Sequence, residues 1–139
     1  MAKSVFIVDD SSIMRRILKD LIESDPDLSV VGMAENGKIA LQVLRELKPD
    51  LVLLDLEMPE MSGLDTLKRL ALVSRAKVII VSSIGQAGAA QAVQARKLGA
   101  VDVIAKPSGP MSLDLKQRRG SEIVDAARRA LGLELPASA

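Results

Sequence analysis

Five short apolar runs alternate along the chain with five stretches of helical pattern, and this alternation constrains the fold more than any other feature. The runs cover residues 5–8, 28–34, 51–54, 77–81 and 101–105. Apolar runs of this length, bounded by turn residues, are typical of strands that are buried on both faces of a parallel sheet. Strands that alternate with helices through right-handed crossovers leave few topologies. We therefore predict an α/β fold with a doubly wound, five-stranded parallel sheet in the order 2-1-3-4-5.

The stretches between the runs place apolar residues at helical spacing, which predicts the face that each helix turns toward the sheet. Ser11 or Ser12 is expected to cap the first helix, because a hydroxyl can accept hydrogen bonds from free N–H groups. The second helix is expected to end at Lys48-Pro49-Asp50. With helices on both faces of the sheet, the expected fold is flavodoxin-like. The inward residues expected for the first three helices are Ile13, Ile17, Leu18, Leu21 and Ile22, then Ala40, Val43, Leu44 and Leu47, then Leu64, Leu67, Leu70 and Ala71.

The last two helices differ from the first three. Residues 86–99 are rich in Ala, Gln and Gly, and Val93 and Leu98 are their main large anchors, so we expect the least firmly held helix there. A basic amphipathic helix then reaches the stop at Gly132, and Gly120-Ser121 is a candidate break within it.

Length and composition exclude several classes of protein. The 139 residues suffice for one domain, which we place at residues 1–132, with 133–139 as a C-terminal tail or the start of a linker. A net charge of +1 argues against a nucleic-acid surface, and no apolar run is long enough to span a membrane. The chain has no Cys and no His, which excludes disulfides, thiolate or His metal sites and Ser-His-Asp hydrolysis. We expect a cytoplasmic protein that binds neither nucleic acid nor membrane.

Four of the predicted strands run directly into residues that can do chemistry. These are Asp9-Asp10, Asp55, Ser82-Ser83 and Lys106, after the first, third, fourth and fifth strands. The carboxyl ends of parallel strands meet at one edge of an open α/β sheet, and ligands bind at that edge. Singly, each residue has an ordinary explanation; Asp55, for example, could cap a turn or the next helix. Their coincidence at four strand ends favours a functional site.

Three carboxylates at one edge call for a compensating cation. Two unit charges about 4 Å apart repel by roughly 4 kcal/mol at an effective dielectric constant near 20. With oxygen ligands and no His or Cys, a hard divalent ion is expected, Mg²⁺ before Ca²⁺ or Mn²⁺. Mg²⁺ beside a carboxylate, a hydroxyl and an ammonium group is suited to phosphoryl transfer. The metal and Lys106 would neutralise the phosphoryl oxygens, and Asp55 could act as the nucleophile and become an acyl phosphate.

At this point the sequence resembles a known family, the receiver domains of bacterial two-component response regulators. The resemblance covers about residues 4–131. It rests on Asp9-Asp10 after the first strand, Asp55 with Met58-Pro59 and Gly63, a hydroxyl after the fourth strand, and Lys106-Pro107.

The resemblance implies a role for each of these residues. Asp55 would accept a phosphoryl group from the phosphohistidine of a partner histidine kinase. Asp10 and Asp55, with the backbone carbonyl of Glu57, would bind Mg²⁺, and Asp9 would assist through water. In the phosphorylated state, Ser82 would contact the phosphoryl group and Lys106 would pair with it.

One subgroup of the family fits better than the others, the regulatory domain of the chemotaxis protein-glutamate methylesterase. In that enzyme the receiver covers a separate catalytic domain and uncovers it when phosphorylated. A catalytic domain of that kind needs a Ser-His-Asp set, so we expect no methylesterase activity in a chain without His. The chain is then either an excised regulatory domain or a stand-alone receiver. The stretches that resemble the subgroup are Met14-Arg15-Arg16, Val81-Ser-Ser-Ile84, Leu98-Gly-Ala-Val-Asp-Val-Ile-Ala-Lys-Pro-Ser-Gly109 and Ser112-Leu-Asp114.

Val103, the serine pair Ser82-Ser83 and Glu57 lie near the site, and each needs an expectation of its own. Val103 stands where many receivers have Tyr or Phe, so signalling through an aromatic switch is not expected. Ser82 is preferred over Ser83 as the switch hydroxyl. Glu57 is expected either to affect the lifetime of the phosphorylated form, by screening the acyl phosphate or by holding Lys106 in the resting state, or to be an ordinary exposed turn residue.

The partners are less constrained than the site. The Ala-rich segment 86–98 is the best candidate for an element with two packings, so the face around residues 86–105 is expected to contact an output domain or partner. Arg15-Arg16 and the basic residues of 116–119 form either a docking surface or, more simply, solvated helix faces. We expect a monomer or weak dimer. The alternatives to a chemotaxis-type switch are a single-domain receiver of another phosphorelay, a Mg²⁺-dependent phosphatase with an Asp nucleophile, and a binding module that is never phosphorylated.

Overall fold

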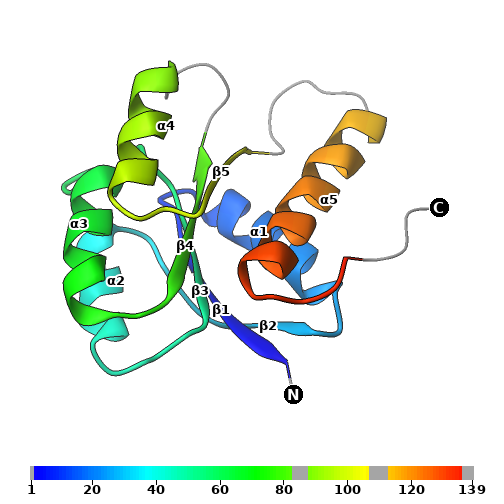
Figure 1. Ribbon diagram of the computed structural model, residues 1–139, viewed down its shortest axis with the longest axis horizontal. Helices are drawn as coiled ribbons and strands as arrows, with labels where there is room; N and C mark the ends of the chain where they lie inside the picture. Colours follow the sequence, from blue (N-terminus) through cyan, green and yellow to red (C-terminus); the bar gives the residue numbers. More distant parts are fainter. Residues whose placement is uncertain (1, 83–87, 107–112, 136–139) are drawn as a thin grey trace.

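The structure, a computed structural model, describes residues 2–82, 88–106 and 113–135. Figure 1 shows a central sheet with helices on both of its faces. Each neighbouring pair of strands is parallel, and the strand order is β2-β1-β3-β4-β5. This arrangement confirms the predicted flavodoxin-like fold and places β2 at an edge. The strands are β1 Lys3–Val8, β2 Leu28–Ala34, β3 Leu51–Leu54, β4 Lys77–Ser82 and β5 Asp102–Ala105.

The helices divide into two groups, one on each face of the sheet. α1 (Ser12–Glu23) and α5 (Leu113–Ala130) cover one face (Figure 1). α2 (Gly37–Leu44), α3 (Gly63–Val73) and α4 (Gly88–Lys97) cover the other. Within the described part of the chain, no helix is both long and apolar enough to cross a membrane.

The first three helices begin with capping side chains. Ser11, Asn36 and Ser62 each accept a hydrogen bond from the backbone N–H three residues later, at 3.1, 2.8 and 3.2 Å. Such caps satisfy donors that the first turn of a helix leaves without partners. Of the two serines predicted as caps for α1, Ser11 is therefore the one that acts.

The core consists of two apolar clusters separated by the sheet. Successive residues of a strand point to opposite faces, so the central strands contribute alternately to the two clusters. The cluster under α1 and α5 takes Val5, Ile7, Leu51, Leu53, Ile79 and Val81. The cluster under α2, α3 and α4 takes Phe6, Val8, Val52, Leu54, Val78 and Ile80.

In α1 and α3, Ile13 and Ala71 lie at the surface, although we expected both to face inward. Ile13 is 72% exposed, and α1 instead buries Met14, Leu18 and Ile22, which are spaced four residues apart. Ile13 precedes that stripe by one residue, or about 100° around the helix. Ala71 is also exposed, one position past the last buried residue of α3.

The predictions for α2 and α4 were also wrong in part. α2 ends at Leu44, earlier than the expected end at Lys48, and Val43 is 38% exposed. In α4, Val93 is 51% exposed, whereas Ala95 is fully buried. The packing of a short helix depends on which face meets the sheet, and side-chain size alone did not reveal that face.

Gly120 does not break the last helix, which continues through it to Ala130. A Cβ atom at Gly120 would lie 2.6 Å from Cδ2 of Leu21, so the glycine allows α5 to pack closely on α1. The stop at Gly132 is confirmed by its φ of +72°, which suits a residue without a side chain.

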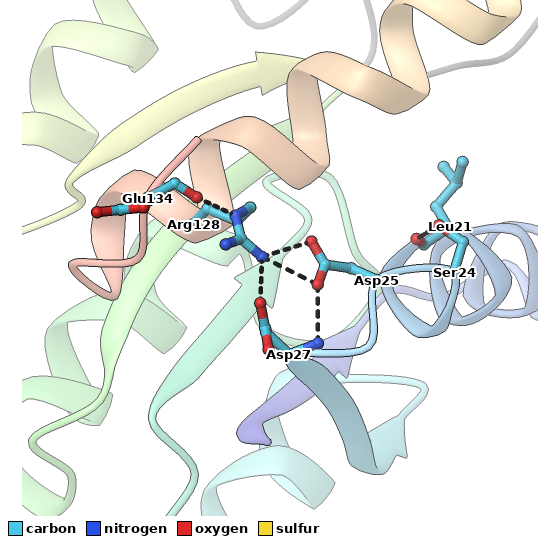
Figure 2. A network of polar contacts seen from close by, with 6 residues as sticks. All are labelled: Leu21, Ser24, Asp25, Asp27, Arg128 and Glu134. Carbon is cyan, nitrogen blue, oxygen red and sulfur yellow. Dashed lines mark hydrogen bonds and ion pairs between the residues drawn. The ribbon is translucent and has the colours of Figure 1, made fainter. Parts of the chain in front are cut away.

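Arg128 ties the end of α5 to the turn between α1 and β2 (Figure 2). Its Nη1 lies 3.0 and 2.9 Å from the two carboxylate oxygens of Asp25 and 2.9 Å from Oδ2 of Asp27. Its Nε donates to the backbone carbonyl of Glu134, and Leu133 packs against the core. The first residues after the helix are therefore held in place, while 136–139 lie outside the described residues. The proposed domain boundary at residue 132 stays a prediction.

Candidate functional site

The carboxyl edge of the sheet gathers the predicted site residues. Asp9 and Asp55 directly follow β1 and β3, Ser82 is the last residue of β4, and Lys106 directly follows β5. Main-chain hydrogen bonds continue past the strand ends: Asp55 N–H donates to the Val8 carbonyl at 3.0 Å, and Lys106 N–H donates to the Ser82 carbonyl at 2.9 Å. The side chains are thus positioned by the sheet itself.

The three aspartates form one acidic cluster. One carboxylate oxygen from each of Asp9, Asp10 and Asp55 can be chosen so that all three lie within 4.8 Å of one another. Asp9 is 1% exposed and Asp55 is 2% exposed, whereas Asp10 is exposed to solvent. The structure therefore brings together the three carboxylates that the strand pattern predicted.

Lys106 lies against the two buried members of this cluster. Its Nζ is 2.9 Å from Oδ2 of Asp9 and 3.1 Å from Oδ2 of Asp55. Burial by itself lowers the pKa of Lys106, but the hydrogen bonds and charges of Asp9 and Asp55 outweigh it and hold that pKa above its usual value. Lys106 therefore stays protonated and stabilises the carboxylates.

Asp55 resists ionisation despite this neighbour. Burial raises the pKa of Asp55 to about 6, the charge of Asp9 acts in the same direction, and Lys106 opposes both. A second cation near the cluster would lower the cost of ionising Asp55.

The donor set fits a hard divalent cation. Oδ2 of Asp9 is buried and, apart from Lys106, has no polar partner among the described residues. Three ionised carboxylates carry three negative charges and Lys106 supplies one positive charge, which leaves two to be balanced. Oxygen ligands are those that Mg²⁺ prefers. Asp9, Asp10 and Asp55 are the side chains that could hold such an ion.

The backbone around the acidic residues is held by short-range contacts. Oδ1 of Asp9 accepts a hydrogen bond from Ser11 N–H at 2.9 Å, and Oδ1 of Asp55 accepts one from Glu57 N–H at 3.3 Å. Nη1 of Arg15 donates to the backbone carbonyl of Asp9 at 2.7 Å. Sequence reasoning treated Arg15 as a docking or solvated residue and missed this contact. The charge pattern of the helix carried no signal for it.

Gly63 lets the start of α3 approach the Asp55 peptide. Its N–H donates to the carbonyl of Leu56 at 2.8 Å. A Cβ atom at this position would lie 2.3 Å from the carbonyl oxygen of Asp55 and 2.5 Å from Cα of Leu56. Any side chain at position 63 would therefore collide with the backbone that carries the candidate nucleophile.

The remaining site predictions have different outcomes. Ser82 is 4% exposed at the end of β4, and Ser83 lies outside the described residues. The side chain of Glu57 is exposed, and the two ion pairs of Lys106 go to Asp9 and Asp55 instead, so Glu57 does not hold Lys106 in this structure. Val103, partly buried, packs against the core.

Comparison with known proteins gives a consistent picture. A family model described as the response regulator receiver domain matches residues 5–117. The protein-glutamate methylesterase/protein-glutamine glutaminase of Halalkalibacterium halodurans is 52% identical over 115 residues, which are 83% of this chain and 33% of that protein. The protein of the same name from Thermotoga maritima is 42% identical over 130 residues, which are 94% of this chain and 38% of that protein. The chain thus spans about a third of the length of the curated relatives that it matches.

Solved structures show the same likeness. The response regulator domain of Thermotoga maritima CheB has a TM-score of 0.84 and 41% identity, with 97% of this chain and all of that chain covered. A structure described as the P1 domain of CheA3 in complex with CheY6 from R. sphaeroides has a TM-score of 0.77 and 39% identity, with 94% of this chain and 97% of that chain covered.

Proposed function

Because this chain belongs to the response regulator receiver domain family, we propose that it is a signalling switch that is phosphorylated on Asp55. The observation that carries the proposal is the pairing of Asp55, a buried carboxylate at the end of β3, with Lys106 inside a cluster of three aspartates. A nucleophilic carboxylate beside a fixed cation and a metal-binding set is the arrangement that phosphoryl transfer requires.

The proposed step moves one phosphoryl group. A carboxylate oxygen of Asp55 attacks phosphorus, the bond from phosphorus to the donor imidazole nitrogen breaks, and its electron pair stays on that nitrogen, which takes up a proton. Asp9, Asp10, Asp55 and the backbone carbonyl of Glu57 would hold Mg²⁺, which supplies positive charge to the phosphoryl oxygens when bound. Lys106 supplies a second positive charge, and Ser82 lies at the end of β4, from where its hydroxyl would donate to the phosphoryl group.

The partners follow from the relatives. We propose that a histidine kinase supplies the phosphoryl group, supported by the likeness to a structure that contains a CheA3 P1 domain. We propose that the chain acts in chemotaxis-type signalling in the cytoplasm as the regulatory part of a methylesterase, supported by relatives that bear that name and of which the matched residues make up 33% and 38%. The methylesterase reaction itself would lie outside this chain, which has no His.

The output surface is proposed to include α4 and β5. Among the described side chains of α4, only Ala95 is fully buried, and Val93 is half exposed. A helix with so few buried side chains can change its packing at a low cost in free energy. We expect such a change when the phosphoryl group contacts Ser82 and shifts the end of the neighbouring β4. A monomer or weak dimer is expected for the chain alone.

Intact mass spectrometry tests the proposal. The chain is incubated with Mg²⁺ and acetyl phosphate or phosphoramidate, and the same is done with Asp55→Asn and with Asp20→Asn, an exposed carboxylate on α1. We expect one hydroxylamine-labile phosphoryl group on the wild type and on Asp20→Asn, and none on Asp55→Asn. An adduct that persists in Asp55→Asn, or none in the wild type, would overturn it.

A further inference from the structure

We propose that Arg15 is a positioning residue, which holds the backbone between Asp9 and Asp10 so that the exposed carboxylate of Asp10 meets the metal ion. This inference rests on the proposed function, because it assigns Arg15 a part in the same Mg²⁺ site. It does not follow from the charge of the residue, since Arg16 next to it has the same charge.

The backbone of Asp9 is held at both of its polar groups. Its N–H donates to the carbonyl of Ala34 in β2 at 3.1 Å. Its carbonyl accepts from Nη1 of Arg15 at 2.7 Å, a short contact with a charged donor. Arg15 lies in the first turn of α1, where its own N–H donates to the Ser11 carbonyl at 2.9 Å, so its partly buried side chain folds back over the loop that precedes its helix.

The carbonyl that Arg15 binds belongs to the peptide unit joining Asp9 to Asp10. The orientation of a peptide plane sets the direction in which the next residue projects its side chain. The carboxylate of Asp9 has contacts of its own, with Ser11 N–H and with Lys106. The carboxylate of Asp10 has no hydrogen bond or ion pair with any of the described residues. Its place in the acidic cluster therefore depends on the backbone on either side of it. The Asp9 carboxylate holds the following peptide through Ser11 N–H, and Arg15 holds the preceding peptide through the Asp9 carbonyl.

Arg16 provides a matched control. It is exposed and makes no hydrogen bond or ion pair with the part of the chain that the structure describes. Both arginines would contribute if α1 served only as a charged docking surface. If Arg15 instead positions the metal site within the chain, only Arg15 should affect Mg²⁺ binding when no partner is present.

The experiment measures Mg²⁺ binding to the unphosphorylated chain by isothermal titration calorimetry, for the wild type, Asp10→Asn, Arg15→Ala, Arg15→Lys and Arg16→Ala. Backbone amide chemical shifts of Asp10 and Ser11 are recorded without metal for each variant, and circular dichroism confirms that each is folded. Loss of one charge-assisted hydrogen bond predicts that Mg²⁺ binding weakens about tenfold in Arg15→Ala. Arg15→Lys, which keeps one charged donor, should fall between, and Arg16→Ala should change less than twofold.

The possible results separate the two proposals. Wild-type binding that Asp10→Asn does not weaken would contradict the Mg²⁺ site and hence the proposed function. Normal wild-type binding that Arg15→Ala leaves unchanged, with unchanged shifts of Asp10 and Ser11, would overturn the role of Arg15 alone. Equal weakening by Arg15→Ala and Arg16→Ala would also overturn it, because a general loss of positive charge would then explain both.

Discussion

Lys106 Nζ lies 3.1 Å from Oδ2 of Asp55, so the carboxylate proposed to accept the phosphoryl group is already ion-paired in the resting site. The same ammonium group is 2.9 Å from Asp9, and the three groups are almost fully buried. Phosphorylation would replace the Asp55 carboxylate with a doubly charged phosphoryl group at the same strand end. Lys106 can then exchange one negative partner for another without becoming unpaired.

Removal of the ammonium group should destabilise the resting site. Lys106→Met keeps most of the side-chain volume but leaves Asp9 and Asp55 buried without their cation. Removing one partner from a buried pair costs about 3–5 kcal/mol, so we expect a loss of this order in metal-free buffer at pH 7. Mg²⁺ should restore part of it, because an ion that binds only the folded chain stabilises that chain. Urea unfolding with and without Mg²⁺ measures both effects.

Lys68→Met is the control for this change, because Lys68 is exposed on α3. It should leave the free energy of unfolding nearly unchanged. A Lys106→Met variant as stable as the control would show that the ammonium group does not stabilise the buried carboxylates.

Stability should depend on pH through Asp55. Its pKa is about 6 in the folded chain, against an ordinary value of 3.8, chiefly because it is buried. Between these two values the folded state holds a proton that the unfolded state lacks, so stability rises as pH falls from 7 toward 4. Asp9 and Lys106 face the same carboxyl group. Asp55→Asn cannot take up this proton. As pH falls from 7 to 4 in metal-free buffer, the free energy of unfolding of the wild type should therefore increase by about 3 kcal/mol relative to that of the variant.

Urea unfolding of both chains at several pH values checks the sign of this effect. A difference between wild type and Asp55→Asn that stays constant from pH 7 to pH 4 would mean that burial does not penalise the charged carboxylate.

Gly63→Ala should disturb both the fold and the site. The new Cβ atom would meet the Asp55 carbonyl at 2.3 Å, and a backbone oxygen has little room to move. Overpacking of this kind costs about 1–3 kcal/mol, occasionally more. Because the strain falls on the Asp55 peptide, phosphorylation by acetyl phosphate should also slow.

Glu60→Gly is the matched change, in the loop that leads into α3. Glu60 has a φ of +69°, which a glycine adopts without strain, so this variant should be at least as stable as the wild type. The midpoint of thermal unfolding should fall in Gly63→Ala and should rise or stay unchanged in Glu60→Gly. Equal stability of Gly63→Ala and the wild type would contradict the close approach of α3 to Asp55.

Arg128→Ala should loosen the junction between α5 and the turn before β2. Figure 2 shows Arg128 beside its carboxylate partner Asp25. The side chain of Asp25 is only 9% exposed, so water cannot readily take the place of the lost guanidinium group. We expect a lower unfolding midpoint for Arg128→Ala than for Arg129→Ala, whose side chain is exposed. The double variant Arg128→Ala/Asp25→Asn should lose less than the sum of the two single variants. Strict additivity in urea unfolding would show that the two residues do not interact.

Local pattern predicted the strands and the polar residues after them. Runs such as Leu51–Leu54 are apolar at every position, and a strand buried on both faces has this pattern whatever its neighbours are. Helix faces were less predictable: Ile13 and Val93 are apolar yet exposed, because a rotation of about 100° changes which residue meets the sheet.

Contacts between distant segments had no local signal. We expected a possible helix break at Gly120, but the helix continues through it. The proximity of Leu21 explains the glycine, because it allows the two helices to pack closely. Arg128 lies in a helix that we expected only to be basic and amphipathic, and its partners lie about 100 residues earlier in the chain. Arg15 read as surface charge, although its guanidinium group binds the backbone of the site.

The sequence by itself determined the α/β class and the set of residues at the carboxyl edge, because parallel strands must bring their ends to one side. Right-handed crossovers left a few strand orders, and the structure shows the order β2-β1-β3-β4-β5 that we predicted among them. Tertiary structure alone decided how those residues are paired. It set Lys106 against Asp9 and Asp55 rather than Glu57, placed Arg15 on the Asp9 carbonyl, and raised the pKa of Asp55. Burial and distances of a few ångströms control these interactions, and neither can be read from the order of residues along a chain.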